Sequence, residues 1–199
     1  MRLESPLVLA SRSPRRRRLL EQIGMAFHVD ASDVDEVVPR DMGPRGVAET
    51  LARRKAEDVA ARQPAALTLG ADTIVVLDGD ILGKPADARE ACEMLRRLSG
   101  NTHVVYTGIA LVHPSTGRAR TVSEATSVTF GEMDDEEIIA YVASGSPMDK
   151  AGAYGIQDDR GAFFVERIDG DFYNVVGLPL RRLYRTLRES FSDLLSSPK

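Results

Sequence analysis

Apolar and polar positions along the chain follow two periods, and each period predicts a different element. A continuous apolar run at residues 7–10 is typical of a buried strand. Directly after it, Ser13 and Pro14 form a helix start, because a serine hydroxyl accepts a hydrogen bond from a free backbone N–H and proline fits the first helical position. Gly24 marks the end of this helix. The pattern predicts a buried strand that leads directly into a helix beginning at Pro14.

A second helix is predicted from about residue 47 to residue 62, after a loop at 30–45 that has no periodicity. Val47, Leu51, Lys55 and Val59 recur every four positions, which places them on one face of the helix. Since the other three residues are apolar, this face is expected to be buried. Lys55 is therefore expected to point inward.

The remaining pattern alternates between strands and helices. Strands are expected at 67–77, 81–82, 104–112, 118–130 and 162–168, and helices at 88–98, at 134–142 and from Pro179 onward. Asp78-Gly79 predicts a hairpin turn, and the short connection at 114–117 predicts an antiparallel pair. Together they indicate a mixed, partly antiparallel α/β sheet with flanking helices. With no repeat or linker in 199 residues, a single domain of two lobes around a central cleft is expected, with a frayed tail at about 192–199.

Composition narrows the classes of function. Hydrophobic residues make up 43% of the chain, enough to bury a substantial core, which excludes disorder for most of it. With 26 Lys+Arg against 30 Asp+Glu the net charge is −4, which argues against broad adhesion to nucleic acid or anionic lipid. No apolar run approaches the ~18 residues of a membrane span. Cys92 is the single cysteine and no signal peptide is recognisable, so a reducing cytoplasm is expected.

The first candidate site is Ser11-Arg12-Ser13-Pro14-Arg15-Arg16, where the first strand meets the first helix. Free backbone N–H groups, hydroxyls and guanidiniums converge at such a junction, and together they suit phosphate oxygens. Two alternatives stay open for the arginines at 15–18: a solvated basic helix face, favoured for Arg17 and Arg18, and a nucleic-acid contact. The net acidic charge and the lack of a neighbouring aromatic platform weigh against the nucleic-acid contact.

The second candidate is Asp72, a carboxylate inside an apolar strand. Burying it is costly unless it is paired, coordinated to a metal or opened into a cleft. A catalytic or metal-binding aspartate is the stronger interpretation, and structural pairing with an arginine is the alternative. Lys55 and Lys84 offer positive charge, although Lys84 alone is most often a surface residue. Glu36 is a second oxygen donor that, with Asp72, suits a hard cation such as Mg²⁺.

Other positions carry weaker signals. Gln157 can donate and accept hydrogen bonds, as recognition of a base edge requires, or it can be a loop surface residue. Asp149 and Lys150 are interpreted as an ordinary solvated loop pair, and Cys92 as a buried apolar residue. His28, His103 and His113 fit no catalytic triad and are expected to be structural or exposed. The dinucleotide and P-loop glycine motifs are both absent.

Five separated blocks of sequence resemble the Maf family of nucleoside triphosphate pyrophosphatases. They are ASRSPRR at 10–16, GADTIV at 70–75, LGKP at 82–85, DKAGAYGIQ at 149–157 and NVVGLP at 174–179. The resemblance implies a cytoplasmic enzyme that hydrolyses a nucleoside triphosphate to the monophosphate and pyrophosphate with a divalent cation, Mg²⁺ or Mn²⁺. It also implies the fold of the inosine triphosphate pyrophosphatases. GADT and GAYGIQ match the subgroup that acts on dTTP and UTP, whereas residues 158–160 match no pattern of the family.

The same resemblance implies a role for each candidate residue. Asp72 matches the proton acceptor, directly or through the metal that it would share with Glu36. Lys55 and Lys84 match cleft positions and would stabilise charge on the leaving pyrophosphate. The implied substrate-binding residues are Ser11, Arg15, Arg16, Thr73 and Gln157.

One alternative function comes from the same family, which is also linked to inhibition of septum formation. In that case the chain would be a nucleotide-dependent regulatory protein without significant catalysis. Acidic, metal-compatible residues beside phosphate-binding ones favour the enzyme. The expected partner is the nucleoside triphosphate, with no membrane and no stable nucleic acid. The resemblance is compatible with a homodimer, which no exposed stripe of the sequence specifies.

Overall fold

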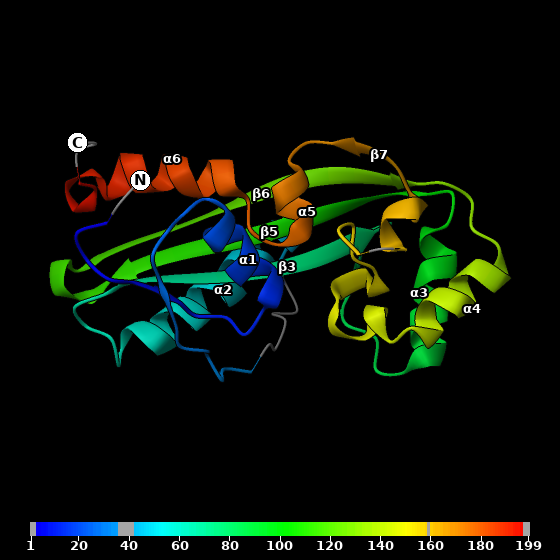
Figure 1. The fold of residues 1–199 in the computed structure, drawn as a ribbon, viewed down its shortest axis with the longest axis horizontal. Helices are drawn as coiled ribbons and strands as arrows, with labels where there is room; N and C mark the ends of the chain where they lie inside the picture. Colours follow the sequence, from blue (N-terminus) through cyan, green and yellow to red (C-terminus); the bar gives the residue numbers. More distant parts are fainter. Residues whose placement is uncertain (1–2, 36–41, 159, 197–199) are drawn as a thin grey trace. The chain divides into compact units, whose positions relative to one another are not determined.

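The computed structural model describes residues 3–35, 42–158 and 160–196. In these residues seven strands form one sheet in the order β2-β1-β3-β5-β6-β7, with β4 paired to β3 (Figure 1). Strand β1 pairs in parallel with β2 and β3, whereas the β3–β4 and β6–β7 pairs are antiparallel. The strands are β1 Leu7–Leu9, β2 His28–Val29, β3 Leu67–Leu77, β4 Asp80–Leu82, β5 Thr102–His113, β6 Arg118–Phe130 and β7 Val165–Asp169. The prediction of a mixed, partly antiparallel sheet is confirmed.

The same described residues contain six α-helices. They are α1 Pro14–Gln22, α2 Pro44–Ala60, α3 Ala88–Leu98, α4 Asp135–Ala143, α5 Phe172–Val176 and α6 Leu180–Ser190. Short 3₁₀ turns occur at Pro114–Thr116, Ser146–Asp149, Ala151–Ala153, Gly161–Phe164 and Ser192–Leu194.

Contacts between residues divide the chain into two compact units. The first unit comprises residues 1–72, 107–124 and 177–199, and the second comprises 73–106 and 125–176. Strands β3, β5 and β6 contribute residues to both, so at three places the chain passes from one unit to the other inside a strand.

Local signals in the sequence predict several element boundaries correctly. The Ser13 hydroxyl accepts a hydrogen bond from the backbone N–H of Arg16, Pro14 is the first residue of α1, and Gly24 follows the helix at φ +65°. A full capping box joins Asp134 and Glu137 at the start of α4. These boundaries depend on residues within one turn of each other, which is why the sequence alone predicts them.

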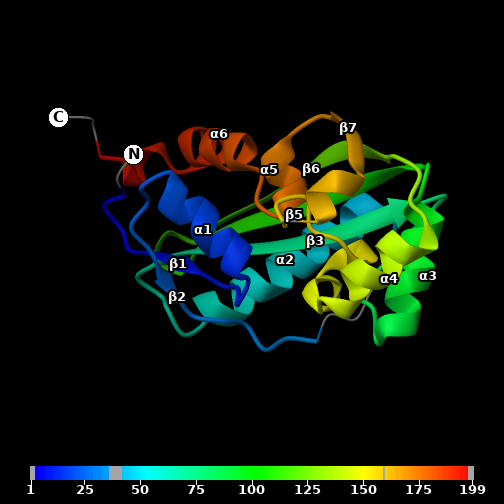
Figure 2. The same cartoon turned by 45° about the vertical axis from the view of Figure 1, so that its right-hand side comes forward.

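Helix α2 packs directly against β3 and β5. A Cβ atom at Gly70 would lie 2.2 Å from the carbonyl oxygen of Ala52, and one at Gly108 would lie 2.3 Å from that of Ala48. Only glycine permits so close an approach of two backbones. Figure 2 shows α2 and α6 on opposite faces of the sheet. The first residue of α2 is Pro44 rather than residue 47, because proline again occupies the first helical turn.

Other expectations need correction. Residues 161–164 form a 3₁₀ turn, so β7 begins at Val165 and not at 162. The tail does not fray from 192, because Asp193 pairs with Arg118 at 2.6 Å and Leu195 bridges to Leu3. Cys92 is half-buried rather than buried. Strand β2 and helix α5 were not predicted, because each is too short to show a period.

A cluster of aromatic rings forms part of the core of the second unit. His103 contacts Phe130 and Tyr154 edge-on, with ring centroids 5.1 and 5.3 Å apart, and its Nε2 lies 2.7 Å from the Tyr154 hydroxyl. Burial lowers the pKa of His103 from 6.5 to about 4, because the charged imidazolium is poorly solvated there. The structural role expected for His103 is confirmed.

This buried histidine predicts how stability depends on pH. Between the folded pKa of about 4 and the ordinary value of 6.5, the unfolded chain binds more protons than the folded protein, so the free energy of unfolding rises with pH in this window. We expect His103 to contribute a loss of about 2 kcal/mol between pH 7.5 and pH 5. Urea denaturation of His103→Gln, whose amide can still bond the Tyr154 hydroxyl, should show a shallower pH slope than the native chain. Equal slopes would contradict the prediction.

Candidate active site

An ion pair between Lys55 of α2 and Asp72 of β3 is buried in the first unit. Lys55 Nζ donates to Asp72 Oδ1 at 2.6 Å, and the two side chains are only 11% and 9% exposed. Successive residues of a strand point to opposite faces, so Asp72 shares the face of Gly70, against which α2 packs. The close approach of α2 at Gly70 therefore brings the lysine to the carboxylate. Lys55 points inward as predicted, and the partner of Asp72 is this lysine rather than an arginine.

A second group of polar side chains surrounds the start of α1. The buried Arg16 donates from Nε to the carbonyl oxygen of Gly177 at 2.8 Å and from Nη1 to the Ser11 hydroxyl at 3.1 Å. Arg15 is half-buried, whereas Arg17 and Arg18 are exposed, as predicted. A guanidinium held in this way stands at the positive end of the α1 dipole, which is a favourable environment for an anion.

The parallel register connects these two groups. Leu9 of β1 pairs with Leu69 of β3, and the N–H of Ala10 donates to the carbonyl oxygen of Leu69 at 2.8 Å. Continuing the register by two residues brings Ser11 to the level of Ala71, one residue before Asp72. The α1 group and the Lys55–Asp72 pair therefore both follow the point where β1 ends. In α/β sheets, ligands bind at the carboxyl ends of parallel strands.

The other predicted residues fall elsewhere. Thr73, Lys84 and Gln157 belong to the second unit, where Thr73 is half-buried and the other two are exposed. The pleat of β3 turns Thr73 to the face opposite Asp72. The structure thus joins Lys55 to Asp72 and Ser11 to Arg16. Glu36 lies outside the described residues.

The donor chemistry around Asp72 suits one kind of metal ion. Within residues 3–35, 42–158 and 160–196, no group of three or more His, Cys, Asp or Glu residues could hold a metal by itself. Asp72 nevertheless offers a hard carboxylate oxygen donor. Mg²⁺ is commonly bound by one or two carboxylates, with water and substrate phosphates completing its octahedron. The residues therefore fit a cation that arrives with a phosphate ligand and do not form a closed metal cage.

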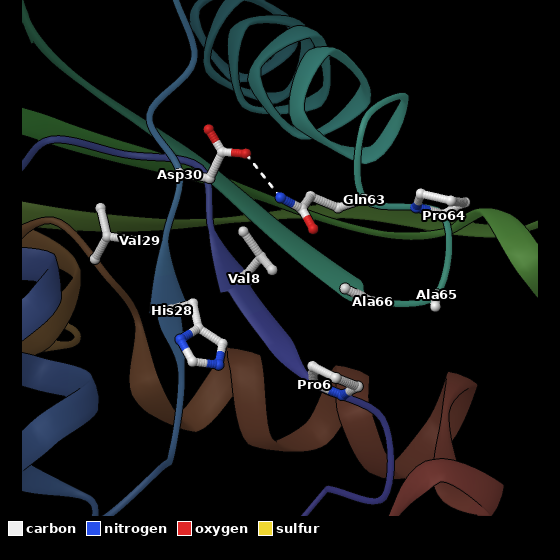
Figure 3. Close-up of a pocket in the computed structure, with 9 residues that line it drawn as sticks. All are labelled: Pro6, Val8, His28, Val29, Asp30, Gln63, Pro64, Ala65 and Ala66. Atoms are coloured by element: carbon white, nitrogen blue, oxygen red, sulfur yellow. Dashed lines mark hydrogen bonds between the residues drawn. The ribbon is translucent and has the colours of Figure 1, made fainter.

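A cavity of about 480 Å³ opens at the other end of the same strands. Pro6, Val8, residues 28–30 and residues 63–66 line it, and Asp30 accepts a hydrogen bond from Gln63 at 3.1 Å (Figure 3). Hydrogen bonds from Arg62 and Gln63 lower the pKa of Asp30. Among the described residues, none of the predicted site residues lines this cavity. Pro6 and Ala66 precede β1 and β3, whereas Ser11 follows β1 and Asp72 lies in the middle of β3.

One charged cluster was missed by the sequence interpretation. Lys150 was expected to be solvated, but only 8% of it is exposed, and its ammonium group lies 3.0 Å from Asp158. A lysine within a run of glycines and alanines was the available signal. Its burial depends on how the loop folds back, which spacing along the chain does not show.

The fold also occurs in a solved structure, that of a HAM1 protein from Coxiella burnetii. The two chains superpose with a TM-score of 0.50 at 16% identity, over 94% of this chain and 100% of the other. By its fold and its charged groups, the protein is a mixed α/β protein with a buried arginine at the start of a helix and a buried lysine–aspartate pair.

Sequence comparison identifies the family. The Maf-like protein model matches residues 6–190, and the chain therefore belongs to the Maf family. A dTTP/UTP pyrophosphatase of Salinibacter ruber is 57% identical over 99% of this chain and 97% of the relative. Another dTTP/UTP pyrophosphatase, of Pelotomaculum thermopropionicum, is 49% identical over 92% of this chain and 95% of the relative. No helix of the described residues is long and apolar enough to span a membrane.

Proposed function

We propose that this protein hydrolyses nucleoside triphosphates, foremost UTP and dTTP, to the monophosphate and pyrophosphate. The observation that carries the proposal is its similarity, along nearly the whole chain, to relatives named dTTP/UTP pyrophosphatase. The buried lysine–aspartate pair and the buried Arg16 at the start of α1 support it, because such an enzyme needs both cationic groups for phosphate and a group that can accept a proton.

The start of α1 binds the triphosphate. Arg16 is held by Gly177 and Ser11 before any ligand arrives, so little side-chain entropy is lost on binding. Arg15 and the Ser11 hydroxyl complete the set of donors, at the positive end of the helix dipole. Charge-assisted hydrogen bonds of this kind neutralise phosphate oxygens without a glycine-rich loop.

Asp72 orients and deprotonates the attacking water. The water oxygen forms a bond to the α-phosphorus, the bond from that phosphorus to its bridging oxygen breaks, and pyrophosphate leaves with the bonding electrons. The water proton passes to the Asp72 carboxylate, which Lys55 holds in place at 2.6 Å. Lys55 and Lys84 stabilise the negative charge that develops on the leaving group. A divalent cation, Mg²⁺ or Mn²⁺, held by Asp72 and Glu36, would neutralise phosphate charge when bound.

Base selection is assigned to Thr73 and Gln157. The Gln157 side chain is exposed and carries both a donor and an acceptor, so its amide can pair with a base edge. We further propose a cytoplasmic location, based on the single cysteine, and a homodimer as the assembly to test by light scattering.

A substrate panel tests the activity. UTP, dTTP, CTP, ATP and GTP are incubated with Mg²⁺ or Mn²⁺, and monophosphate and pyrophosphate are measured. We expect UTP and dTTP to give the highest kcat/KM, with equal amounts of the two products. Orthophosphate as the first product would mean attack at the terminal phosphorus and would contradict the proposal. Stabilisation by nucleotide without product would instead indicate the regulatory protein.

A further inference from the structure

Lys150 is the centre of a charged cluster in the second unit. Its Nζ lies 2.7 Å from Asp149 Oδ1 and 3.0 Å from Asp158 Oδ2, and it donates to the backbone carbonyl oxygen of Ser146. The Lys150 side chain is 9% exposed and that of Asp158 is 21% exposed. A buried ammonium group is stable only when it is paired, so this cluster holds the loop together.

The Asp158 carboxylate is fixed against the backbone of its own loop. Its Oδ2 accepts a hydrogen bond from the Ser146 hydroxyl at 2.6 Å, besides the contact to Lys150. A Cβ atom at Gly155 would lie only 2.5 Å from the same oxygen, so the carboxylate folds back over a position where only glycine leaves room. One oxygen of Asp158 is therefore used for anchoring.

The other carboxylate oxygen of Asp158 accepts a hydrogen bond from Gln157. The amide Nε2 of Gln157 donates to Asp158 Oδ1 at 3.0 Å. Because an ionised carboxylate can only accept hydrogen bonds, the NH₂ of Gln157 must face Asp158, and its Oε1 must face away. The carboxylate thereby sets which way the exposed amide of Gln157 is turned.

This orientation has a consequence for base recognition. Uracil and thymine carry an N3–H donor beside the O4 acceptor, whereas cytosine carries an N3 acceptor beside an N4 amino donor. With Nε2 held by Asp158, Gln157 offers its Oε1 to N3–H and its second N–H to the neighbouring carbonyl. Pairing with cytosine requires the amide to turn over, which places Oε1 against the Asp158 carboxylate. The turned state thus loses one hydrogen bond and gains a repulsion.

On the basis of the proposed function, in which Gln157 contacts the base, we propose that Asp158 is a positioning residue that selects uracil and thymine over cytosine. It acts through the amide of Gln157 and does not touch the substrate. Guanine presents the same donor and acceptor on its N1–H/O6 edge. Asp158 therefore selects bases with an N–H beside a carbonyl group over bases with an acceptor nitrogen beside an amino group. The exclusion of purines must arise from the size of the site.

The test compares UTP with CTP, which differ only at this edge of the base. In Asp158→Asn the residue can donate as well as accept, so Gln157 can take either orientation. We expect the ratio of kcat/KM for UTP to that for CTP to fall by about tenfold. A merely structural role would lower both values equally and leave the ratio unchanged.

Two matched variants complete the test. Ser146→Ala removes a hydrogen bond to the anchoring oxygen but leaves the one to Gln157, so its ratio should stay near that of the native protein. In a Gln157→Ala background, Asp158→Asn should no longer change the ratio, because the amide through which Asp158 acts is gone. A change of similar size in both backgrounds would overturn the proposal.

The remaining outcomes are distinguishable. A native protein that releases no pyrophosphate from UTP would overturn the proposed function and this role with it. An active native protein with an unchanged ratio in Asp158→Asn would overturn only the role of Asp158. If Asp158→Asn does not fold, Asp158→Ala takes its place with the same expected ratio. If neither folds, as judged by circular dichroism, Asp158 serves the fold and the proposal is wrong.

Discussion

Asp72→Asn is expected to lower kcat for UTP hydrolysis by roughly 10²–10⁴-fold, the usual effect of removing a general base. Asparagine has nearly the same shape and can still accept the hydrogen bond from Lys55, but it cannot take a proton from water. KM for UTP should rise by less than kcat falls, because Asp72 would also hold the cation but the donors at the start of α1 are unaffected. Steady-state measurement of pyrophosphate release gives both constants.

The control for this variant is a measurement of its folding and stability. The buried ammonium of Lys55 loses its counter-charge, so the free energy of unfolding should fall by about 1–3 kcal/mol while the circular dichroism spectrum stays the same. Near-native turnover in a folded Asp72→Asn protein would remove Asp72 from the mechanism as the proton acceptor.

The second large effect is on stability. Lys55→Met should lower the free energy of unfolding by about 3–5 kcal/mol, because the Asp72 carboxylate is left buried without its partner at 2.6 Å. Urea denaturation at pH 7.5 measures the change. Arg53→Met is the matched control on the same helix, since Arg53 is exposed and pairs with Glu57 one turn away. Its effect should be no more than about 0.5 kcal/mol.

A double variant separates stability from catalysis. In Lys55→Met with Asp72→Asn both charges are gone, so much of the lost stability should return, whereas activity should not. Equal destabilisation by Lys55→Met and by Arg53→Met would mean that the ion pair contributes little, contrary to its burial.

Sequence analysis predicted the elements whose signals are local. Ser13-Pro14, Asp78-Gly79 and the capping box at Asp134 each act within a few residues, and all three appear where expected. β2 and α5 were missed because two and five residues are too few to show a period. The tail was mispredicted because a contact with Arg118, far away in the chain, holds it.

For the candidate site, too, the sequence predicted the behaviour of single residues but not which residues pair. The helical period alone indicated that Lys55 points inward, and the apolar run alone indicated that Asp72 is buried. That each is the other's partner follows from the approach of α2 to β3 at Gly70, which no spacing along the chain reveals. The sequence likewise did not predict that Lys150 is buried or that Asp158 contacts both Lys150 and Gln157. These contacts depend on the path of a folded-back loop.

By itself, the sequence determined the type of most elements, the inward direction of a lysine and the resemblance to the Maf family. These depend on periodicity and on neighbouring residues, which act over one or two turns of chain. The tertiary structure alone decided which charges meet and which way the amide of Gln157 is turned. Pairing buried charges requires backbones to come within a few ångströms, and that proximity arises only when distant segments pack together.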